Sequence, residues 1–590
     1  MLLPNVIAVI PTEVLRIRIQ DISRPNLETH ARKLRYYALG EACLNWNMSY
    51  ILFGHHEDDD YETFLYRMSC KYHPDHLLIP PDINMPEHRD HYGIYNSGNM
   101  RILPSLKRKR FWDGKNLDFA GRVVGIEDGG LNVGRPLLEF PKDRLIATCR
   151  KLGIPWIEDE TNKDRTLTIR NAVRHIVKTH KLPAALTKGS FLQVRDSIRE
   201  RQRISSLLTK KLFDICDISL DVRNGTAQVR FPKITVLKGM INNLEPLKYT
   251  DSIQVEPITA LLLKKVQGLV SRAMSATTTE IDRAVKNILT PLQGEPGYDE
   301  DRPRLSYFRI GTCSYKHCRT IPDTNTDTLL DPWTWMVTRT VFPSSVIKGR
   351  QPHLQKIHLQ NLKSVLDPSP ACGGLGESNI RIPVQCDGHQ PEFHLWDRRF
   401  WIRVRHYFNT DLQIKPLTDF HWNLIRQLLV REHFDFAVPE LNIYSGGIDE
   451  LNDIKILAKG DIKFTLPVIE GPPLPDGKFP IPIAIPTLGL RMSPRGNFRK
   501  LWKWPTDVLW EVRYRKADLG TNWEQRLAAE DEKWSWNRPV KSSEMKKPVK
   551  SSEIKKPAKS SEMKKPISTP IVNSNQLRQE ILKLEAEITK

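Results

Sequence analysis

The sequence contains no apolar run that approaches the roughly 20 residues needed to cross a bilayer as a helix. Its first 20 residues lack the basic lead-in and cleavage site of a signal peptide, and the Arg- and Ser-rich pattern of a mitochondrial transit peptide. The eight cysteines are scattered over 590 residues and suggest no disulfide framework. We therefore expect a soluble, intracellular protein without membrane spans.

Positive charge is what the sequence has in excess. The formal net charge is +20 and the pI is near 9.5. Residues 541–566 hold nine Lys and three Glu, so they supply +6 and leave +14 for the rest of the chain. Such an excess predicts a polyanionic partner, with nucleic acid favoured over a membrane surface.

The periodicity of the first 185 residues indicates alternating strands and helices. Apolar side chains recur at strand spacing in residues 14–19, and residues 50–53 form a short run typical of a buried strand. Helical spacing or helix signals occur in four segments: residues 26–44, 61–68, 144–152 and 168–180. This order predicts an α/β fold over residues 1–185, a partial doubly wound parallel sheet with an insertion or loop at 71–134.

Four further regions are expected along the chain: a mainly helical region (186–300), an α+β accessory region that could bind nucleic acid (301–520), a disordered linker with KSSExKKP repeats (521–574) and a short amphipathic helix (575–590). Within them we predict helices at 190–215 and 258–289 and a strand at 400–404.

The stretch GHHEDDDYET, residues 54–63, crowds carboxylates at the start of a predicted helix. Asp59-x-x-Glu62 has the spacing of a capping box, and acids in a first turn suit the helix dipole. A cap needs only one or two acids, whereas the cluster here would suit a cation or an ammonium group. Because the stretch follows a predicted strand, it lies where ligands of open α/β sheets bind. Both interpretations stay open on this stretch alone.

Five sequence blocks resemble, in order, those of tRNA(Ile)-lysidine synthases, which are nucleotide-loop ATP pyrophosphatases. Residues 56–63 resemble the family's H-x-D-D-Q-x-E-T motif, with Asp60 where Gln is usual. The other blocks are N-x-E-x-x-A-R-x-x-R-Y at 26–36, R-P-L-L at 135–138, W-x-E-D-x-S-N at 156–162, with Thr161 where Ser is usual, and R-N-x-x-R at 170–174. The resemblance is to a eukaryotic, fungal-like member and spans residues 26–70 and 135–180.

The resemblance implies an ATP-dependent ligase that joins L-lysine to the wobble cytidine of a tRNA(Ile) with a CAU anticodon. Lysidine would form through an adenylated intermediate. The implied cofactors are ATP and Mg²⁺, the partners are tRNA(Ile), L-lysine and ATP, and the family's chemistry favours a mitochondrial location. It implies no membrane partner and leaves the oligomeric state open.

The same resemblance assigns candidate roles: catalysis to Asp59, Glu62 and Arg35, lysine binding to Asp59, Glu62 and Arg32, Mg²⁺ binding to Asp58, ATP binding to His56, and tRNA binding to Arg135, Arg170, Asn171, Arg174 and Lys178. The residue types suit these roles. Carboxylates three residues apart share a helix face and can hold an ammonium group, and guanidinium groups suit phosphate. Basic residues at four-residue spacing suit an RNA backbone, although they also fit a solvated helix face.

The family's S-G-G-x-D-S loop, whose amides cradle the ATP pyrophosphate, does not occur before Val14. We therefore expect an N-terminally truncated ATP domain, whose loop lies in a longer form of the chain, comes from a partner or has been lost. Ser445-Gly-Gly-Ile-Asp449 imitates the loop, but Glu450 would repel phosphate. Two alternative functions are a catalytically inactive tRNA-binding relative and a tRNA thiolation enzyme, which the lack of paired Cys-x-x-Cys disfavours.

Three other patterns imitate functional sites. His-x-x-His at 73–76 and at 88–91 has metal-ligand spacing but lies in a Pro-rich segment without cysteines, so solvated histidines are expected. Cys313 and Cys318 have no second pair, which disfavours a redox role. Residues 398–405 alternate, so Arg399, Trp401, Arg403 and Arg405 either form a face that stacks RNA bases or pack against the next layer.

Overall fold

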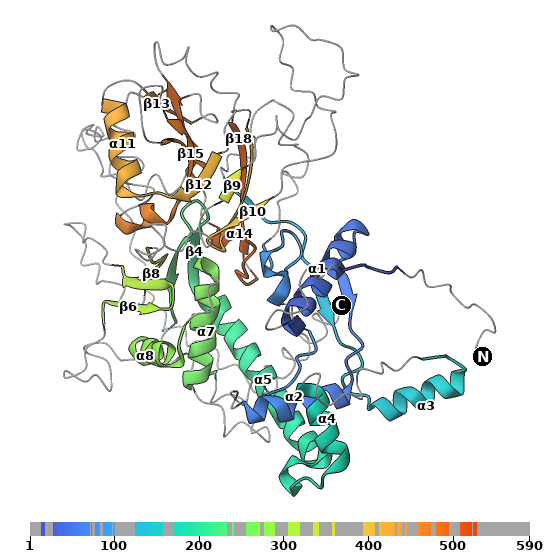
Figure 1. The fold of residues 1–590 in the computed structure, drawn as a ribbon. Coiled ribbons are helices and arrows are strands. Elements are labelled where there is room, and N and C mark those ends of the chain that lie inside the picture. Colours follow the sequence, from blue (N-terminus) through green and yellow to red (C-terminus); the bar gives the residue numbers. More distant parts are fainter. Residues whose placement is uncertain are drawn as a thin grey trace, which may run out of the picture.

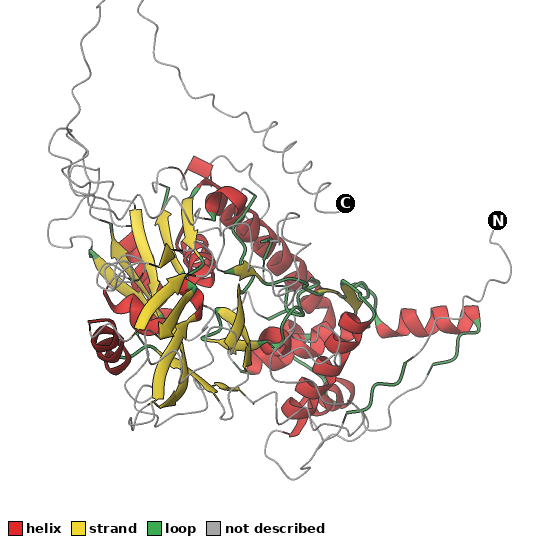
Figure 2. Ribbon diagram, turned by 90° about the horizontal axis from the view of Figure 1, so that it is seen from above, coloured by secondary structure: helices red, strands yellow, loops and turns green. Residues whose placement is uncertain are grey.

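Four open sheets and the helices between them make up the described part of the computed structural model (Figure 1). The structure describes residues 13–17, 27–70, 72, 77–82, 86–96, 98–100, 124–156, 169–232, 236, 239–240, 255–271, 276–289, 305–318, 334–341, 357–359, 393–406, 412–430, 434–438, 443–444, 458, 460–473, 480–494, 508–521 and 523–527. Most strands gather on one side of the molecule (Figure 2). The mixed α/β class is confirmed.

The N-terminal part contains the predicted alternation. Its elements are α1 (Leu27–Asn45), β1 (Tyr50–Leu52), α2 (Glu57–Ser69), the 3-10 turn η2 (Pro86–Asp90), β3 (Asn132–Gly134) and α3 (Lys142–Leu152). Strands β1 and β3 pair in parallel, with Ile51 opposite Val133. Tyr36 of α1 packs with Val133 and Ile51, so α1 covers this side of the pair. Helix α3 buries no side chain and projects from the body (Figure 1).

Two predictions for this part need correction, and a third segment contains strands that were not predicted. Residues 13–17 form no strand, and 18–19 lie outside the described residues. Strand β1 is not buried, because among the described residues it pairs only with β3 and its Tyr50 and Leu52 side chains are 64% and 68% exposed. The predicted insertion at 71–134 supplies β2 (Gly125–Ile126) and β3, strands too short for periodicity to reveal.

A long helix links the two ends of the structure. The central elements are α4 (Ile169–Thr179), η5 (Ala184–Leu186), α5 (Lys188–Ile215), α7 (Val255–Val270) and α8 (Thr278–Leu289). The helices at 168–180 and 190–215 are confirmed, but the single helix at 258–289 is divided. Thr277 and Glu280 form a capping box there, since each accepts a hydrogen bond from the other's backbone amide. These bonds start a second helix.

Three sheets pack beyond these helices. One has the order β4 (Asp217–Asp221), β5 (Thr226–Arg230), β8 (Thr334–Arg339), β7 (Cys313–His317) and β6 (Tyr307–Ile310). A second has the order β10 (His394–Trp396), β11 (Phe400–His406), β18 (Val508–Tyr514) and β2. The third has the order β14 (Ile443–Tyr444), β13 (Phe434–Val438), β17 (Leu490–Pro494), β16 (Pro480–Ile485), β15 (Pro467–Pro473), β12 (Leu412–Pro416) and β9 (Ile357–Leu359). Helix α11 (Asp419–Val430) and the 3-10 turns η8 (Gly460–Thr465) and η9 (Pro486–Leu488) lie near this sheet, whereas α14 (Trp523–Arg526) contacts β4 of the first sheet.

The alternating segment 398–405 packs inside the protein. Arg399 and Trp401 are 2% and 1% exposed. Arg399 donates hydrogen bonds to the carbonyls of Asn224 and Thr465, and Arg403 donates to Glu511. The packing interpretation is confirmed, because side chains buried in this way cannot stack RNA bases.

The segment predicted as an insertion docks on the C-terminal sheet. Strand β2 runs parallel to β18, with Gly125 opposite Arg513. Arg513 donates a hydrogen bond of 2.6 Å to the hydroxyl of Tyr92, and its guanidinium lies 2.7 Å from Asp128. The N-terminal α/β part and the last strand of the structure therefore share one buried polar junction.

Several predicted features lie outside the described residues: His73 and His76, residues 157–168, the Ser445–Asp449 imitation of the loop, the KSSExKKP repeats and the helix at 575–590. His88 is buried and shares a hydrogen bond with the carbonyl of Tyr36, so the solvated histidine expected there is wrong. No group of three or more potential metal ligands occurs in the part of the chain that the structure describes. None of the helices described is long and apolar enough to span a membrane.

Candidate functional site

The acidic stretch forms the first turns of α2, directly after the carboxyl end of β1. His56 is the N-cap: its backbone amide donates to Asp59 at 3.0 Å, and the Asp59 amide donates to its Nδ1 at 3.4 Å. The capping box therefore joins His56 and Asp59 rather than Asp59 and Glu62, because the helix begins at Glu57. The stretch is a helix cap, as its spacing suggested, but with the partners displaced by three residues.

Cations from helices α4 and α5 form ion pairs with the carboxylates of the acidic turn. Five carboxylates meet four cations in this cluster: Glu57 with Lys188 (3.1 Å) and Arg195 (3.2 Å), Asp58 with Lys188 (2.6 Å), Asp60 with Arg199 (3.1 Å), and Glu62 (2.6 Å) and Asp59 (3.4 Å) with Arg174. These nine side chains carry a formal net charge of −1. We call them the acidic-turn cluster.

Apolar packing holds the three helices in place. Tyr61 and Phe64 of α2 pack with Phe191 and Ile198 of α5 in a buried group of side chains. The Tyr61 hydroxyl also donates a hydrogen bond of 2.6 Å to the carbonyl of Leu186. The acidic-turn cluster thus lies at the rim of a small core, where its side chains are partly shielded from water and their mutual attractions are stronger than in bulk solvent.

Burial and pairing move the pKa values of the cluster in different directions. Burial favours the neutral form of Asp58, but hydrogen bonds from Lys188 and the Lys142 amide outweigh it and lower its pKa below the usual range. Asp60 is fully buried, and burial raises its pKa although the Ile79 amide and Arg199 favour its charged form. Asp58 is therefore ionised at neutral pH, and Asp60 ionises less readily than an ordinary aspartate.

The two carboxylates proposed to hold lysine already share one cation. Arg174 donates from Nε to Glu62 at 2.6 Å and from Nη2 to Asp59 at 3.4 Å. Burial favours the neutral form of Arg174, but the bond to Glu62 raises its pKa. The side chains of Glu62 and Asp59 are only 10% and 14% exposed. The geometry shows that this pair can bind a single cationic nitrogen group.

A second group of candidates gathers around two aromatic rings. The guanidinium groups of Arg32 and Arg35 lie 4.6 and 5.4 Å from the centre of the Tyr36 ring, and that of Arg135 lies 5.9 Å from the Phe53 ring. The two rings meet edge to face. Arg135 directly follows β3, so these arginines lie near the carboxyl ends of both parallel strands, which is where ligands of such sheets bind.

The residues predicted to contact tRNA do not form one exposed stripe. Asn171 is buried and Arg174 faces the acidic turn, so Lys178 is the exposed one among the predicted α4 residues whose side chains the structure describes. The side chain of Arg170 lies outside the described residues. Arg135 is 8% exposed and donates to the carbonyl of Pro80.

Three cations of the cluster were not predicted from the sequence. Lys188, Arg195 and Arg199 lie on one face of α5, seven and four residues apart, which is the spacing of a helical stripe. That spacing within a predicted helix was the available signal. The spacing does not identify the partners of these cations, however, because the carboxylates that pair with them lie 130, 138 and 139 residues earlier in the sequence.

The residues present fit ATP better than Mg²⁺. Both oxygens of Asp58 accept protein donors, the Lys142 amide and the Lys188 ammonium, so a metal ion bound there would compete with these two partners. Arg135, by contrast, has a buried Nε without a hydrogen-bond partner among the described residues. Such a donor, at the carboxyl end of a parallel strand, is suited to a phosphate oxygen.

Comparison with known proteins identifies relatives for this part of the chain. The PP-loop domain family matches residues 5–79 and 122–181. A probable tRNA(Ile)-lysidine synthase of Schizosaccharomyces pombe is 31% identical over 169 residues, 28% of this chain and 29% of that protein. The tRNA(Ile)-lysidine synthase of Wolbachia pipientis wMel is 26% identical over 28% of each chain. That of Vibrio parahaemolyticus is 27% identical over 39% of this chain and 44% of its own. Each match therefore covers less than half of the relative.

Proposed function

Because the chain carries a PP-loop domain, which implies ATP binding, and is distantly homologous to tRNA(Ile)-lysidine synthases, we propose that it is a tRNA-modifying ligase. It would join lysine to the wobble cytidine of a tRNA(Ile) with a CAU anticodon, using ATP. The proposal extends to the location, a mitochondrion, and to Mg²⁺ as a companion of ATP, with Asp58 as its candidate ligand.

The observation that carries this proposal is the shared cation of Asp59 and Glu62. Two carboxylates that hold the guanidinium of Arg174 at 3.4 and 2.6 Å can also hold the ε-ammonium group of lysine. When lysine takes the place of Arg174, its ammonium group replaces the positive charge that the guanidinium supplied, and the formal net charge of the acidic-turn cluster stays at −1. A carboxylate beside that group can then accept the proton that the amine must lose before it attacks carbon.

The other candidates are assigned roles that fit their positions. Arg32 and Arg35 would stabilise negative charge that develops on the adenylated base, and Arg135 would contact phosphate. Lys178, with Arg170, would contact the tRNA near the acidic turn, whereas the buried Asn171 would not reach it. Arg174 would leave the two carboxylates when lysine arrives and pair with the tRNA backbone instead.

A catalytically inactive tRNA-binding protein is the second candidate, and one observation favours it: every carboxylate of the acidic-turn cluster already has a protein partner. A thiolation enzyme is less well supported. Burial raises the pKa of Cys216 and of Cys313 to about 12, so neither thiol readily forms the thiolate that sulfur transfer needs.

The test is transfer of labelled lysine. The protein is purified from its own cells, with its natural ends and partners, and incubated with ATP, labelled lysine and a tRNA(Ile) transcript with a CAU anticodon. Label in the tRNA that depends on ATP supports the ligase, and its absence while the same tRNA binds supports the inactive protein.

Matched variants connect the activity with the site. Glu62→Gln should lower the rate of transfer about 100-fold, the range for loss of a group that moves a proton. Glu139→Gln is the control, because this carboxylate lies at the edge of the cluster beside Arg199 but is 75% exposed. Equal rates for the two variants would refute the assignment of Glu62.

A further inference from the structure

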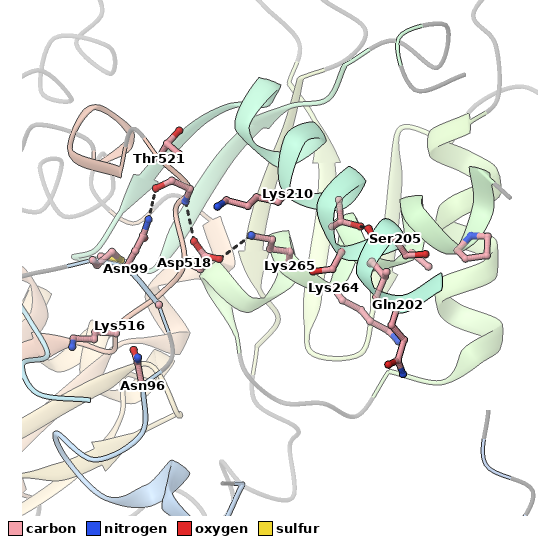
Figure 3. Close-up of a pocket in the computed structure, with 18 of the residues that line it drawn as sticks. Asn96, Asn99, Gln202, Ser205, Lys210, Lys264, Lys265, Lys516, Asp518 and Thr521 are labelled. Atoms are coloured by element: carbon pink, nitrogen blue, oxygen red, sulfur yellow. Dashed lines mark hydrogen bonds and ion pairs between the residues drawn. The ribbon is translucent and has the colours of Figure 1, made fainter. Parts of the chain in front are cut away.

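A large groove opens along helices α5 and α7, on the C-terminal side of the acidic-turn cluster. It is also lined by α8 and by residues 96–100, 129–132 and 516–521, and its volume is about 1350 Å³ (Figure 3). Sites for small ligands usually enclose roughly 300–1,000 Å³. The groove is therefore larger than one small molecule fills and suits an extended ligand.

Four lysine side chains line this groove: Lys210, Lys264, Lys265 and Lys516. Two of them are engaged, since the ammonium of Lys265 lies 2.8 Å from Asp518 and Lys516 donates to the carbonyl of Gly129. Lys210 and Lys264 have no ion-pair or hydrogen-bond partner in the part of the chain that the structure describes. Lys210 and Lys265 reach from their helices toward the loop that carries Asp518 (Figure 3). The groove therefore has two free cations for an anionic ligand.

The groove also presents oxygen atoms. Glu256 lies eight residues before Lys264 on α7, or about 12 Å along the helix axis. Asp282 and the hydroxyl groups of Ser206 and Thr278 line the groove as well. None of these four side chains has a hydrogen-bond or ion-pair partner among the described residues. The groove thus offers both free cations and free acceptors along its length.

This combination of free cations and free acceptors matches single-stranded RNA better than a free phosphate or a uniformly anionic surface. Phosphates of the backbone pair with lysine, and carboxylates accept hydrogen bonds from the exocyclic amino group of cytosine. Unpaired RNA exposes both features to one protein surface. A ligand with phosphates alone would be repelled by Glu256 and Asp282.

The groove and the acidic-turn cluster lie on the same helix. Arg199, which pairs with Asp60, precedes Lys210 by eleven residues, or about 16 Å along α5. One RNA strand could therefore contact the groove while a neighbouring nucleotide reaches the acidic turn.

We propose that this groove binds a single-stranded segment of RNA, with Lys210 and Lys264 on its phosphates and Glu256 and Asp282 on the edges of its bases. The inference rests on the proposed function only for the identity of the RNA, which would be the tRNA whose wobble base is modified.

The test is the salt dependence of RNA binding by the full chain, measured without ATP and lysine. The probes are an unstructured 12-nucleotide RNA, the tRNA(Ile) transcript and AMP. The double variant Lys210→Ala/Lys264→Ala is compared with Lys211→Ala/Lys316→Ala, which removes the same charge from α5 and from strand β7 outside the groove. The basic tail is common to both, so its contribution cancels.

Each phosphate contact on a single strand adds about 0.7 to the slope of log K against log salt. The groove variant should therefore lose about 1.4 in slope and bind either RNA roughly 25-fold more weakly at 0.1 M salt, while the control keeps both values. Glu256→Gln/Asp282→Asn should keep the slope but lose a preference for cytidine-rich over uridine-rich 12-mers.

An unchanged slope in the groove variant would overturn the proposal, and so would binding of AMP that depends on the two lysines while RNA binding does not. The outcome is separate from that of the ligase. Loss of the slope without any lysine transfer leaves the groove proposal standing, and transfer with an unchanged slope leaves only the ligase.

Discussion

Replacement of Arg174 by Ala should release α4 from the acidic turn. The guanidinium joins α4 to Glu62 and Asp59 across 112 and 115 residues of sequence. Removal of one partner from a fully buried ion pair costs roughly 3–5 kcal/mol, and a surface pair contributes at most about 1 kcal/mol. The Arg174 side chain is 26% exposed, so we expect a cost between these limits, about 2 kcal/mol.

Hydrogen exchange of the α4 amides measures this cost locally, which avoids the assumption of two-state unfolding for a chain with several sheets. A loss of about 2 kcal/mol should speed exchange in α4 roughly 30-fold. Lys178→Ala is the matched control, because it removes one positive charge from the exposed face of the same helix. Equal exchange rates in the two variants would refute the claim that the ion pair holds α4 on α2.

Three other predictions follow from burial and close contact. Burial raises the pKa of Asp60, so the folded protein should lose stability as pH rises from the ordinary aspartate pKa of about 3.9 toward the raised value. Thermal unfolding of Asp60→Asn should not show this loss. If the unfolding temperatures of the two proteins changed in parallel with pH, the prediction would be contradicted. A Cβ at Gly98 would overlap the Ala517 backbone, so Gly98→Ala should make the segment at 86–100 sensitive to proteolysis. A Cβ at Gly189 would meet no atom within 4 Å, so Gly189→Ala should leave the proteolysis unchanged. Cys70 is exposed and Cys313 is buried, with a pKa raised to about 12, so iodoacetamide at pH 8 should label Cys70 at least about 100-fold faster, as mass spectrometry of the peptides would show.

Local pattern was sufficient to predict most helices of the N-terminal part. α1, α2 and α3 follow from apolar spacing and from Pro141 as a start signal, because these features act within a few residues. The short strand β3 could not be predicted in this way. Three residues in an irregular segment carry no periodicity, and their strand conformation comes from pairing with β1.

The limits are clearest at the candidate site. Sequence spacing placed Asp59 and Glu62 on one helix face and Arg174 in a basic stripe, but it contained no information that these three side chains meet. Ion pairs over more than 100 residues depend on how α2, α4 and α5 pack, and the apolar side chains that determine this packing are far apart in sequence. The groove between α5 and α7 is likewise a property of packing alone.

The most direct measurement of the central claim is the mass of the wobble nucleoside in the tRNA(Ile) with the CAU anticodon, taken from cells that make this protein and from the same cells after its depletion. The proposed function predicts lysidine in the first sample and unmodified cytidine in the second. Lysidine at an equal level in both samples, or cytidine in both, would contradict it.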